Sequence, residues 1–206
     1  MISQPMATCK SAGERFFRYY HRYCVAPDID VLFELLNAIH SLNDKLQKAT
    51  SENFFACPEF TALKALRNLL HHEAELIHEV RPLSVADLPI MSDVLSLCLV
   101  PRSLVERAIE QLDKKRRSQD EEAIRSTLKW YAEVVNINPC IFNFAVHAFE
   151  KLRGLEIDLD GEEYAEFERS YQFEEDTGHS HYISGDIRCH AGDVDAVLNS
   201  AFRKIT

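Results

Sequence analysis

Glycine and proline are scarce in this chain of 206 residues, which has six glycines and seven prolines. Because these residues interrupt regular structure, their scarcity disfavours a barrel or sandwich built from many short strands. No stretch approaches 18 consecutive apolar residues, and the first ten residues lack the apolar run of a signal peptide. We therefore expect a helical protein that does not enter a membrane and that resides in the cytoplasm.

Paired cysteine motifs are also missing. The six cysteines are spread along the chain without a CxxC pair, and several have apolar neighbours. In a chain of this size, that distribution indicates reduced and mostly buried thiols rather than a disulfide framework. One group places metal-capable residues close together in the sequence: His179, His181, Cys189 and His190. Its spacing differs from that of zinc sites, so we interpret it as a polar loop and expect no metal and no cofactor.

The motifs of nucleotide hydrolysis and of serine hydrolases are absent, since there is no Walker motif, no Gly-rich phosphate loop and no GxSxG. A basic surplus is absent too, because 33 acidic residues face 23 basic ones and give a formal net charge of −10. Such a chain has no overall field that attracts nucleic acid, so RNA binding would need a local basic patch. The candidate patch is the run Lys114-Lys115-Arg116-Arg117, although such runs are common at solvated helix ends.

The chain does have helical periodicity. Apolar residues recur three or four positions apart between Leu32 and Leu46, and again between Phe60 and Ile77. This spacing predicts two amphipathic helices that would pair as an antiparallel hairpin. Residues 1–13 are expected to be a loose lead-in, and 81–92 a linker. Helices are predicted over about 14–24, 28–48, 59–80, 102–118, 120–136, 140–153 and 193–204.

The character of the sequence changes after Gly154. Residues 155–178 carry ten Asp or Glu residues with little apolar periodicity, and a turn-rich stretch follows. We therefore predict a helical domain over residues 1–154 and an acidic, less regular C-terminal extension over 155–206, which ends in a short helix. The predicted fold class is all-α, an antiparallel helical bundle.

The second helix of the predicted hairpin carries the motif Arg67-Asn68-Leu69-Leu70-His71-His72, an RNxxxH pattern. Cleavage of RNA through its own 2′-hydroxyl requires a base, an acid and positive charge on the phosphorane. A histidine suits proton transfer near neutral pH, and an arginine can bind two phosphate oxygens at once. Asn68 could orient the phosphate or the histidine. This chemistry requires no metal.

The motif resembles that of the HEPN superfamily, helical proteins whose active members are metal-independent ribonucleases. The resemblance covers chiefly residues 28–80. It implies a homodimer with the site built across its two-fold interface, in which Arg67 stabilises the phosphorane and His72 transfers protons. Asn68 and His71 would then orient or assist. The resemblance further implies RNA as the substrate and a toxin or defence role, and it leaves room for a protein antitoxin or regulator as a partner.

Two alternatives stay open. On a helix with about 100° per residue, Arg67 and His71 lie about 40° apart but Arg67 and His72 about 140° apart. Geometry therefore favours His71, whereas the resemblance favours His72. Arg67, His71 and Glu75 could also form an ordinary ladder of i,i+4 contacts on a solvated helix face. In that case the chain would be a non-catalytic helical dimerisation or interaction module.

Overall fold

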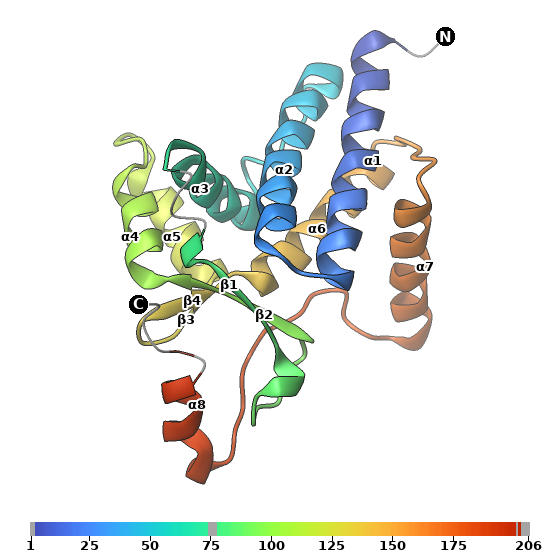
Figure 1. Cartoon of the computed structure of the whole chain (residues 1–206). Helices are drawn as coiled ribbons and strands as arrows, with labels where there is room; N and C mark the ends of the chain where they lie inside the picture. Colours follow the sequence, from blue (N-terminus) through green and yellow to red (C-terminus); the bar gives the residue numbers. More distant parts are fainter. Residues whose placement is uncertain (1–2, 74–77, 201, 203–206) are drawn as a thin grey trace.

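The structure is a computed structural model that describes residues 3–73, 78–200 and 202. Helices dominate it and gather around a small antiparallel sheet (Figure 1). The helices are α1 (Gln4–Val25), α2 (Ile29–Thr50), α3 (Pro58–His72), α4 (Arg102–Glu110), α5 (Arg117–Thr127), α6 (Asn138–Gly154), α7 (Glu162–Thr177) and α8 (Val194–Ser200). The strands are β1 (Arg81–Ser84), β2 (Ser96–Pro101), β3 (Lys129–Trp130) and β4 (Val134–Asn136), and the 3-10 turns are η2 (Val85–Asp87) and η3 (Ala191–Asp193). Within these described ranges, no helix combines the length and the apolar character needed to cross a membrane.

Local signals set the ends of several helices. The Asp28 carboxylate caps α2 by accepting a hydrogen bond of 2.8 Å from the amide of Val31. Pro58 and Pro139 lie in the first turns of α3 and α6, where the missing N–H of proline leaves no helical bond unmade. Gly178 ends α7 in the left-handed conformation, at φ +72°.

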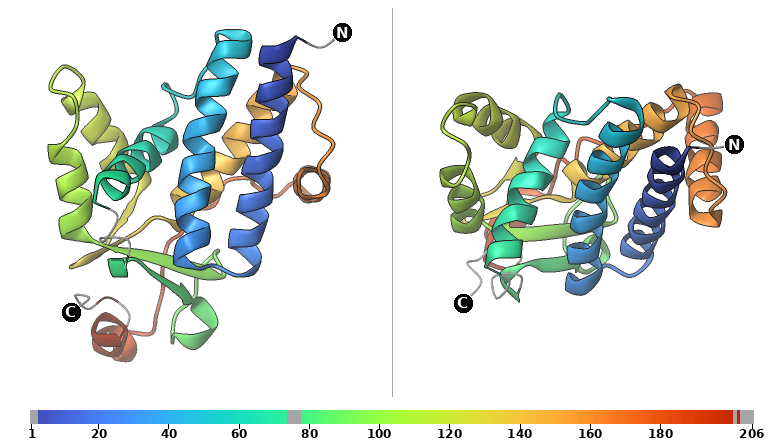
Figure 2. Two further views of the ribbon diagram at one scale, coloured as in Figure 1. Left: turned by 45° about the horizontal axis from the view of Figure 1, so that its top comes forward. Right: turned by 90° about the horizontal axis from the view of Figure 1, so that it is seen from above.

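The principal antiparallel helix pair is α1 with α2, and not the predicted pair of α2 with α3. Figures 1 and 2 show α1 and α2 side by side, while α3 crosses α2 at an angle. The predicted lead-in is helical from Gln4 onward and buries Cys9 and Ala12, so α1 is long enough to pair with α2 along most of its length. Seen from above in Figure 2, α3 lies between α2 and the pair formed by α4 and α5.

The structure is mostly helical, as predicted, but a four-stranded sheet that the all-α prediction did not include lies beneath the helices. Its order is β1-β2-β4-β3, and all neighbouring strands are antiparallel. Side chains of β2 alternate between two cores, since Cys98 and Val100 belong to the helical core and Leu97 and Leu99 to a second core that includes Phe202. Both faces of the sheet are therefore covered, and the predicted linker at 81–92 contributes β1.

Three predicted helices are shorter than expected. The helix predicted over 59–80 ends at His72, and its expected residues 74–77 lie outside the described part of the chain. The helix predicted over 102–118 ends at Glu110, and the one predicted over 120–136 ends at Thr127. Beyond Thr127 the chain forms β3 and β4, because β4 finds backbone partners in β2 and buries its β-branched residues there, and β3 pairs with β4.

The acidic segment is more regular than predicted. It contains α7, whose Tyr164 ring lies 5.0 Å from that of Phe17, and whose Tyr171 ring lies 4.7 Å from that of Phe149. Aromatic residues seven positions apart hold this helix to α1 and α6, a pattern too sparse to stand out among the surrounding carboxylates. The helix α6 ends at Gly154, and Tyr164 beyond it belongs to the same core as the helices before it. The last predicted helix is α8, and residues 201, 203 and 204 of that prediction lie outside the described residues.

Candidate functional site

The RNxxxH motif occupies the C-terminal end of α3. Leu66, Leu69 and Leu70 are buried and fix this end of the helix in the core. Arg67 and Asn68 are half-buried, whereas His71 and His72 are exposed on consecutive positions of the last turn. The rings of the two histidines lie 5.8 Å apart.

The residue after the motif attaches α3 to α4. The Glu73 carboxylate forms an ion pair with Arg107 and accepts a hydrogen bond of 3.3 Å from the side-chain amide of Gln111. Both partners lie at the end of α4 or directly after it. These contacts hold His72 next to the turn that joins α4 and α5.

Arg67 points away from that turn, toward α2. Its Nε donates to Oδ1 of Asn37 at 3.0 Å, and its Nη1 lies 3.4 Å from Oδ1 of Asn68. His40 lies close by on α2, with Nδ1 3.5 Å from the carboxylate of Asp44. Burial lowers the pKa of His40, and the charges of Arg67 and of a neighbouring lysine lower it further against the opposing effect of Asp44.

His72 and Asn68 line a cavity of about 360 Å³ between α3, α4 and α5. Lys64 on α3 and Arg116 on the turn before α5 line the same cavity. An imidazole, an amide and two cations are thus presented to one space, which suits a phosphate group. Arg67 and His71 do not belong to the lining, so one chain does not bring Arg67 and His72 together at one site.

Carboxylates also reach this cavity and moderate its charge. Asp113 and Asp120 are among the lining residues, and Arg116 forms an ion pair of 3.4 Å with Asp120. An anion that enters the cavity would compete with Asp120 for the guanidinium group.

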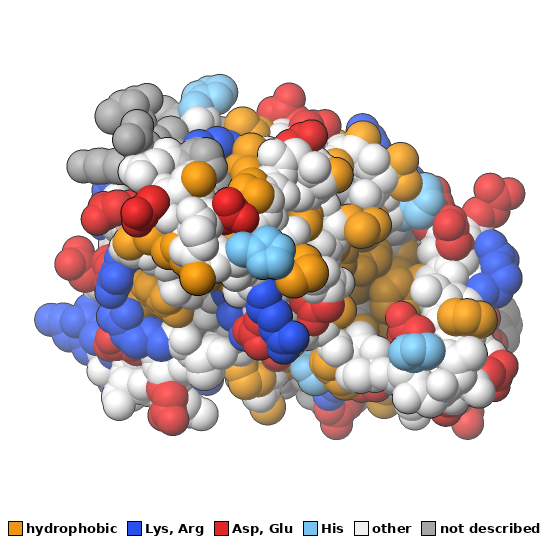
Figure 3. Space-filling model, turned by 90° about the horizontal axis from the view of Figure 1, so that it is seen from below, with side chains coloured by type: hydrophobic (Ala, Val, Ile, Leu, Met, Phe, Trp, Pro, Cys, Tyr) orange, Lys and Arg blue, Asp and Glu red, His pale blue; other side chains and the backbone are white. Residues whose placement is uncertain are grey.

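The basic run does not end a helix as predicted but forms the turn between α4 and α5 and the start of α5. Lys114, Lys115 and Arg116 are exposed, and only Arg116 lines the cavity next to His72. Arg117 is half-buried and donates from Nη2 to the carbonyl oxygen of Glu110 at 2.6 Å. Figure 3 shows that Lys and Arg side chains on the underside gather toward this end of the molecule.

Much of the remaining basic charge near this end is already paired. Arg125 forms two hydrogen bonds of 3.1 and 2.8 Å with the carboxylate of Glu106. Lys129 lies 2.9 Å from the carboxylate of Asp186. The field available to an RNA backbone is therefore local to the turn between α4 and α5.

A second cavity, of about 480 Å³, lies between α1, α6 and α7, and no residue of the RNxxxH motif lines it. Figure 3 shows a recess with hydrophobic side chains in it on this side of the molecule. Aromatic rings and the carboxylates of Glu163, Glu166 and Glu174 line it, and no described lysine or arginine does. That lining disfavours a phosphate group.

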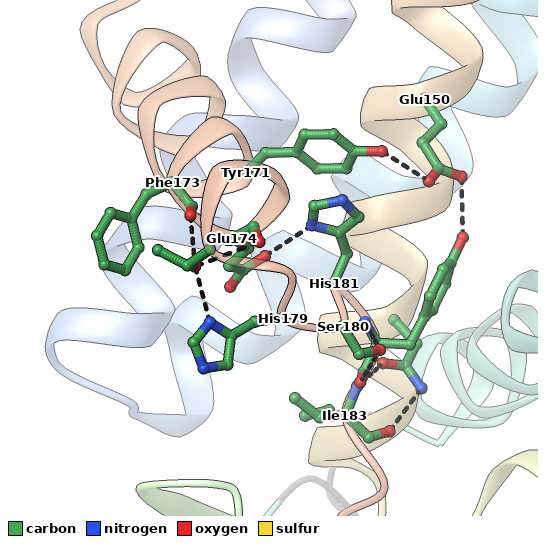
Figure 4. A network of polar contacts seen from close by, with 11 residues as sticks. Glu150, Tyr171, Phe173, Glu174, His179, Ser180, His181 and Ile183 are labelled. Atoms are coloured by element: carbon green, nitrogen blue, oxygen red, sulfur yellow. Dashed lines mark hydrogen bonds and ion pairs between the residues drawn. The ribbon is translucent and has the colours of Figure 1, made fainter.

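The predicted metal-capable residues near the C-terminus do not converge. His179 bonds through Nδ1 to the hydroxyl of Thr177 at 2.7 Å, and His181 bonds through Nδ1 to Glu174 at 2.9 Å (Figure 4). Among the described residues, His179, His181, Cys189 and His190 do not form a group that could hold a metal ion. His181 instead stacks on Tyr171, with ring centroids 3.6 Å apart.

The sequence interpretation missed two residues at the motif. Lys64 lies one turn before Asn68 and two turns before His72, so spacing at i, i+4 and i+8 places all three on one face of α3. That spacing was a usable signal. His40 is 27 positions before Arg67, and no local pattern connects the two.

Comparison of the chain with protein-family models, with curated proteins and with solved structures finds no match. The resemblance to the HEPN superfamily therefore rests on the motif and its helical setting alone.

Proposed function

We propose that this protein is a metal-independent endoribonuclease, and that the cavity between α3, α4 and α5 is its reaction site. One observation carries the proposal. Asn68 and His72 from the motif and Arg116 from the basic run, selected by separate sequence arguments, line the same cavity. The HEPN-like motif supplies the reaction type.

In the proposed reaction, His72 removes the proton from the 2′-hydroxyl, and the 2′-oxygen attacks the neighbouring phosphorus. The bond from phosphorus to the 5′-oxygen breaks, a proton is returned to that oxygen, and the products are a 2′,3′-cyclic phosphate and a 5′-hydroxyl. Lys64 and Arg116 would stabilise the added negative charge, and Asn68 would orient the phosphate. An exposed imidazole is accessible to a chain of RNA without opening the fold.

The role of Arg67 in the reaction needs a separate explanation, because this side chain faces α2 of its own chain and does not line the cavity. In the proposed homodimer, Arg67 of one protomer acts at the His72 of the other. This arrangement makes a distinct prediction. Mixing the inactive variants Arg67→Ala and His72→Ala would restore part of the activity. In a dimer with one protomer of each variant, one of the two sites would combine an intact Arg67 with an intact His72.

The first experiment is cleavage of a mixed RNA pool in EDTA by the wild-type protein and by the variants His72→Ala and His71→Ala. We expect the wild type to cleave, His72→Ala to lose at least about 100-fold in rate, and His71→Ala to retain most activity. Circular dichroism in the same buffer checks that each protein stays folded. An inactive, folded wild type across RNA substrates would contradict the proposal, as would full activity of His72→Ala.

The second candidate is a non-catalytic helical interaction module. It is favoured by the contact of Arg67 with Asn37, which connects α3 to α2 and gives the arginine a structural use within the chain. A toxin or defence role, and an antitoxin or regulator as partner, belong to the nuclease proposal only. Light scattering separates the candidates further, because a dimer that dissociates in Arg67→Ala without any RNA cleavage by the wild type would favour the module.

A further inference from the structure

Three side chains from distant parts of the sequence converge where α3 begins beside α6. Cys57 precedes α3, Glu59 lies in its first turn and His147 lies on α6. Their ligand atoms all lie within 4.8 Å of one another, and all three residues are half-buried. Oε2 of Glu59 lies 3.3 Å from Sγ of Cys57 and 3.4 Å from Nε2 of His147.

These separations suit a tetrahedral metal ion. Zinc bonds of about 2.3 Å to sulfur and about 2.0 to 2.1 Å to nitrogen or oxygen place neighbouring ligand atoms about 3.3 to 3.6 Å apart at tetrahedral angles. The observed distances to the Glu59 carboxylate lie in or next to that range. A thiolate, an imidazole and a carboxylate together form a ligand set typical of zinc. Two negative ligands would also balance the charge of Zn²⁺.

An outer layer of hydrogen bonds already orients the histidine. Nδ1 of His147 lies 3.2 Å from the hydroxyl of Tyr182, and that hydroxyl donates to Oε2 of Glu150 at 2.8 Å. Tyr171 donates to the other oxygen of Glu150 at 3.1 Å, as Figure 4 shows. Because the Tyr182 proton goes to Glu150, its oxygen is free to accept the Nδ1 proton. This tautomer leaves a lone pair on Nε2, the atom that faces Glu59, and such second partners are characteristic of metal-bound histidines.

A nucleophilic cysteine is the competing interpretation of the same cluster. Burial raises the pKa of the Cys57 thiol to about 12, against the opposing effect of nearby helix amides, so the thiol is protonated at neutral pH. The thiol donates to Glu59, and Cys57 does not line the cavity that contains His72. The cluster therefore offers a substrate no thiolate.

We infer that Cys57, Glu59 and His147 bind one Zn²⁺ ion, with water as the fourth ligand. Cys57 releases its proton on binding, so zinc affinity rises with pH. The ion joins the segment before α3 to α6 and fixes the start of the helix that carries the RNxxxH motif. None of the three ligands lines the cavity that contains Asn68 and His72, so the inference does not depend on the proposed ribonuclease reaction.

The test uses Co²⁺ as a spectroscopic substitute for Zn²⁺ on the full chain, after removal of bound metal by a chelator and in the presence of a phosphine reductant. We expect one Co²⁺ per chain, intense visible bands of tetrahedral coordination and a near-ultraviolet thiolate-to-cobalt charge-transfer band. One equivalent of Zn²⁺ would abolish these bands. Competition with a zinc-binding dye then gives the zinc affinity of each variant.

The variants separate the site from non-specific binding. Cys57→Ser should lose the charge-transfer band, and His147→Gln should lower zinc affinity by more than about 100-fold, because removal of a ligand costs more than removal of its outer partner. Tyr182→Phe should lower it by about tenfold. The control is Cys24→Ser, an exposed cysteine that does not belong to the cluster, which should leave both spectrum and affinity unchanged. A wild type without the charge-transfer band would overturn the inference, as would Cys57→Ser and His147→Gln variants that bind zinc as the wild type does.

Discussion

The hydroxyl of Tyr23 on α1 donates a hydrogen bond of 2.5 Å to Oδ1 of Asn138, the first residue of α6. Both residues are buried, and Asn138 also donates from Nδ2 to the carbonyl oxygen of Ser96 at 2.8 Å. One asparagine thus joins α1, α6 and the first residue of β2. The helical layer and the sheet meet at this hydrogen-bonded contact as well as through apolar packing.

Removal of this contact should destabilise the fold. Asn138→Ala leaves the Tyr23 hydroxyl and the Ser96 carbonyl oxygen without their partner, and we expect a loss of about 2 to 3 kcal/mol. Tyr23→Phe removes one donor and should cost about 1 to 2 kcal/mol. Urea unfolding followed by circular dichroism measures both losses. Tyr19→Phe, on the same helix but half-buried, is the control and should stay within about 0.5 kcal/mol of the wild type. Equal effects at Tyr19 and Tyr23 would contradict the role of the hydrogen bond.

His40 should titrate below the usual histidine pKa of about 6.5. Burial lowers its pKa first, and the positive charge of Arg67 lowers it as well. The folded protein then binds fewer protons than the unfolded chain just below pH 6.5, so its stability falls as the pH is lowered through this range toward the folded-state pKa. NMR titration of the histidine ring protons measures the pKa directly.

Arg67→Met tests the charge contribution at His40. Removal of the guanidinium should raise the pKa of His40 while leaving its burial nearly unchanged. Arg18→Met, an exposed arginine on α1, serves as the control. An unchanged pKa of His40 in Arg67→Met would mean that Arg67 on α3 does not lie close to His40 on α2.

Arg116 should matter for RNA cleavage more than its neighbour Lys115 does. Both side chains are exposed in the same turn, but only Arg116 lines the cavity with His72. Under the proposed function, Arg116→Gln should reduce kcat/KM for RNA at least about tenfold, whereas Lys115→Gln should have a small effect that increased salt removes. Initial rates at two salt concentrations measure the difference. Equal losses in the two variants would indicate a diffuse electrostatic contribution instead of a phosphate site.

The helices were predictable where apolar periodicity was long and uninterrupted. The spacing from Leu32 to Leu46 and the proline in the first turn of α6 gave elements close to those observed. The strands were not predictable in the same way. β3 and β4 have two and three residues, which are too few to show the alternation of apolar and polar residues that marks a strand. They form because β2 supplies the backbone partners of β4, which lie more than 30 positions away in the sequence, and β4 in turn pairs with β3.

The candidate site was likewise predictable only where local spacing decides the geometry. Helical spacing alone indicated that Arg67 and His72 point in different directions, and in the structure one faces Asn37 while the other lines the cavity. The approach of Arg116 to His72 depends on how α4 and α5 fold back on α3, which no local pattern encodes. The group of Cys57 and His147 spans 90 positions and lacks any motif spacing, so only tertiary structure brings it together.

Gly185 fixes the segment that follows α7 onto the start of α6. Its φ is +69°, and a Cβ atom at this position would lie 2.0 Å from Cγ of Pro139. The carboxylate of Asp93 accepts hydrogen bonds from the amides of Ser184 and Gly185, at 2.6 and 2.8 Å. Backbone conformation, close packing and two hydrogen bonds therefore coincide at one residue.

Gly178 provides a matched control for a substitution at Gly185. It too has a positive φ, of +72°, but no heavy atom lies within 4 Å of the position its Cβ would take. Gly178→Ala should cost about 1 to 2 kcal/mol, the strain of the left-handed conformation alone. Gly185→Ala adds the clash with Pro139 and should cost at least about 1 kcal/mol more. Urea unfolding gives the two values, and limited proteolysis should show earlier cleavage near residue 185 in Gly185→Ala only. Similar costs and cleavage patterns in the two variants would mean that the segment is not packed against Pro139, since backbone strain is common to both glycines and the clash belongs to Gly185 alone.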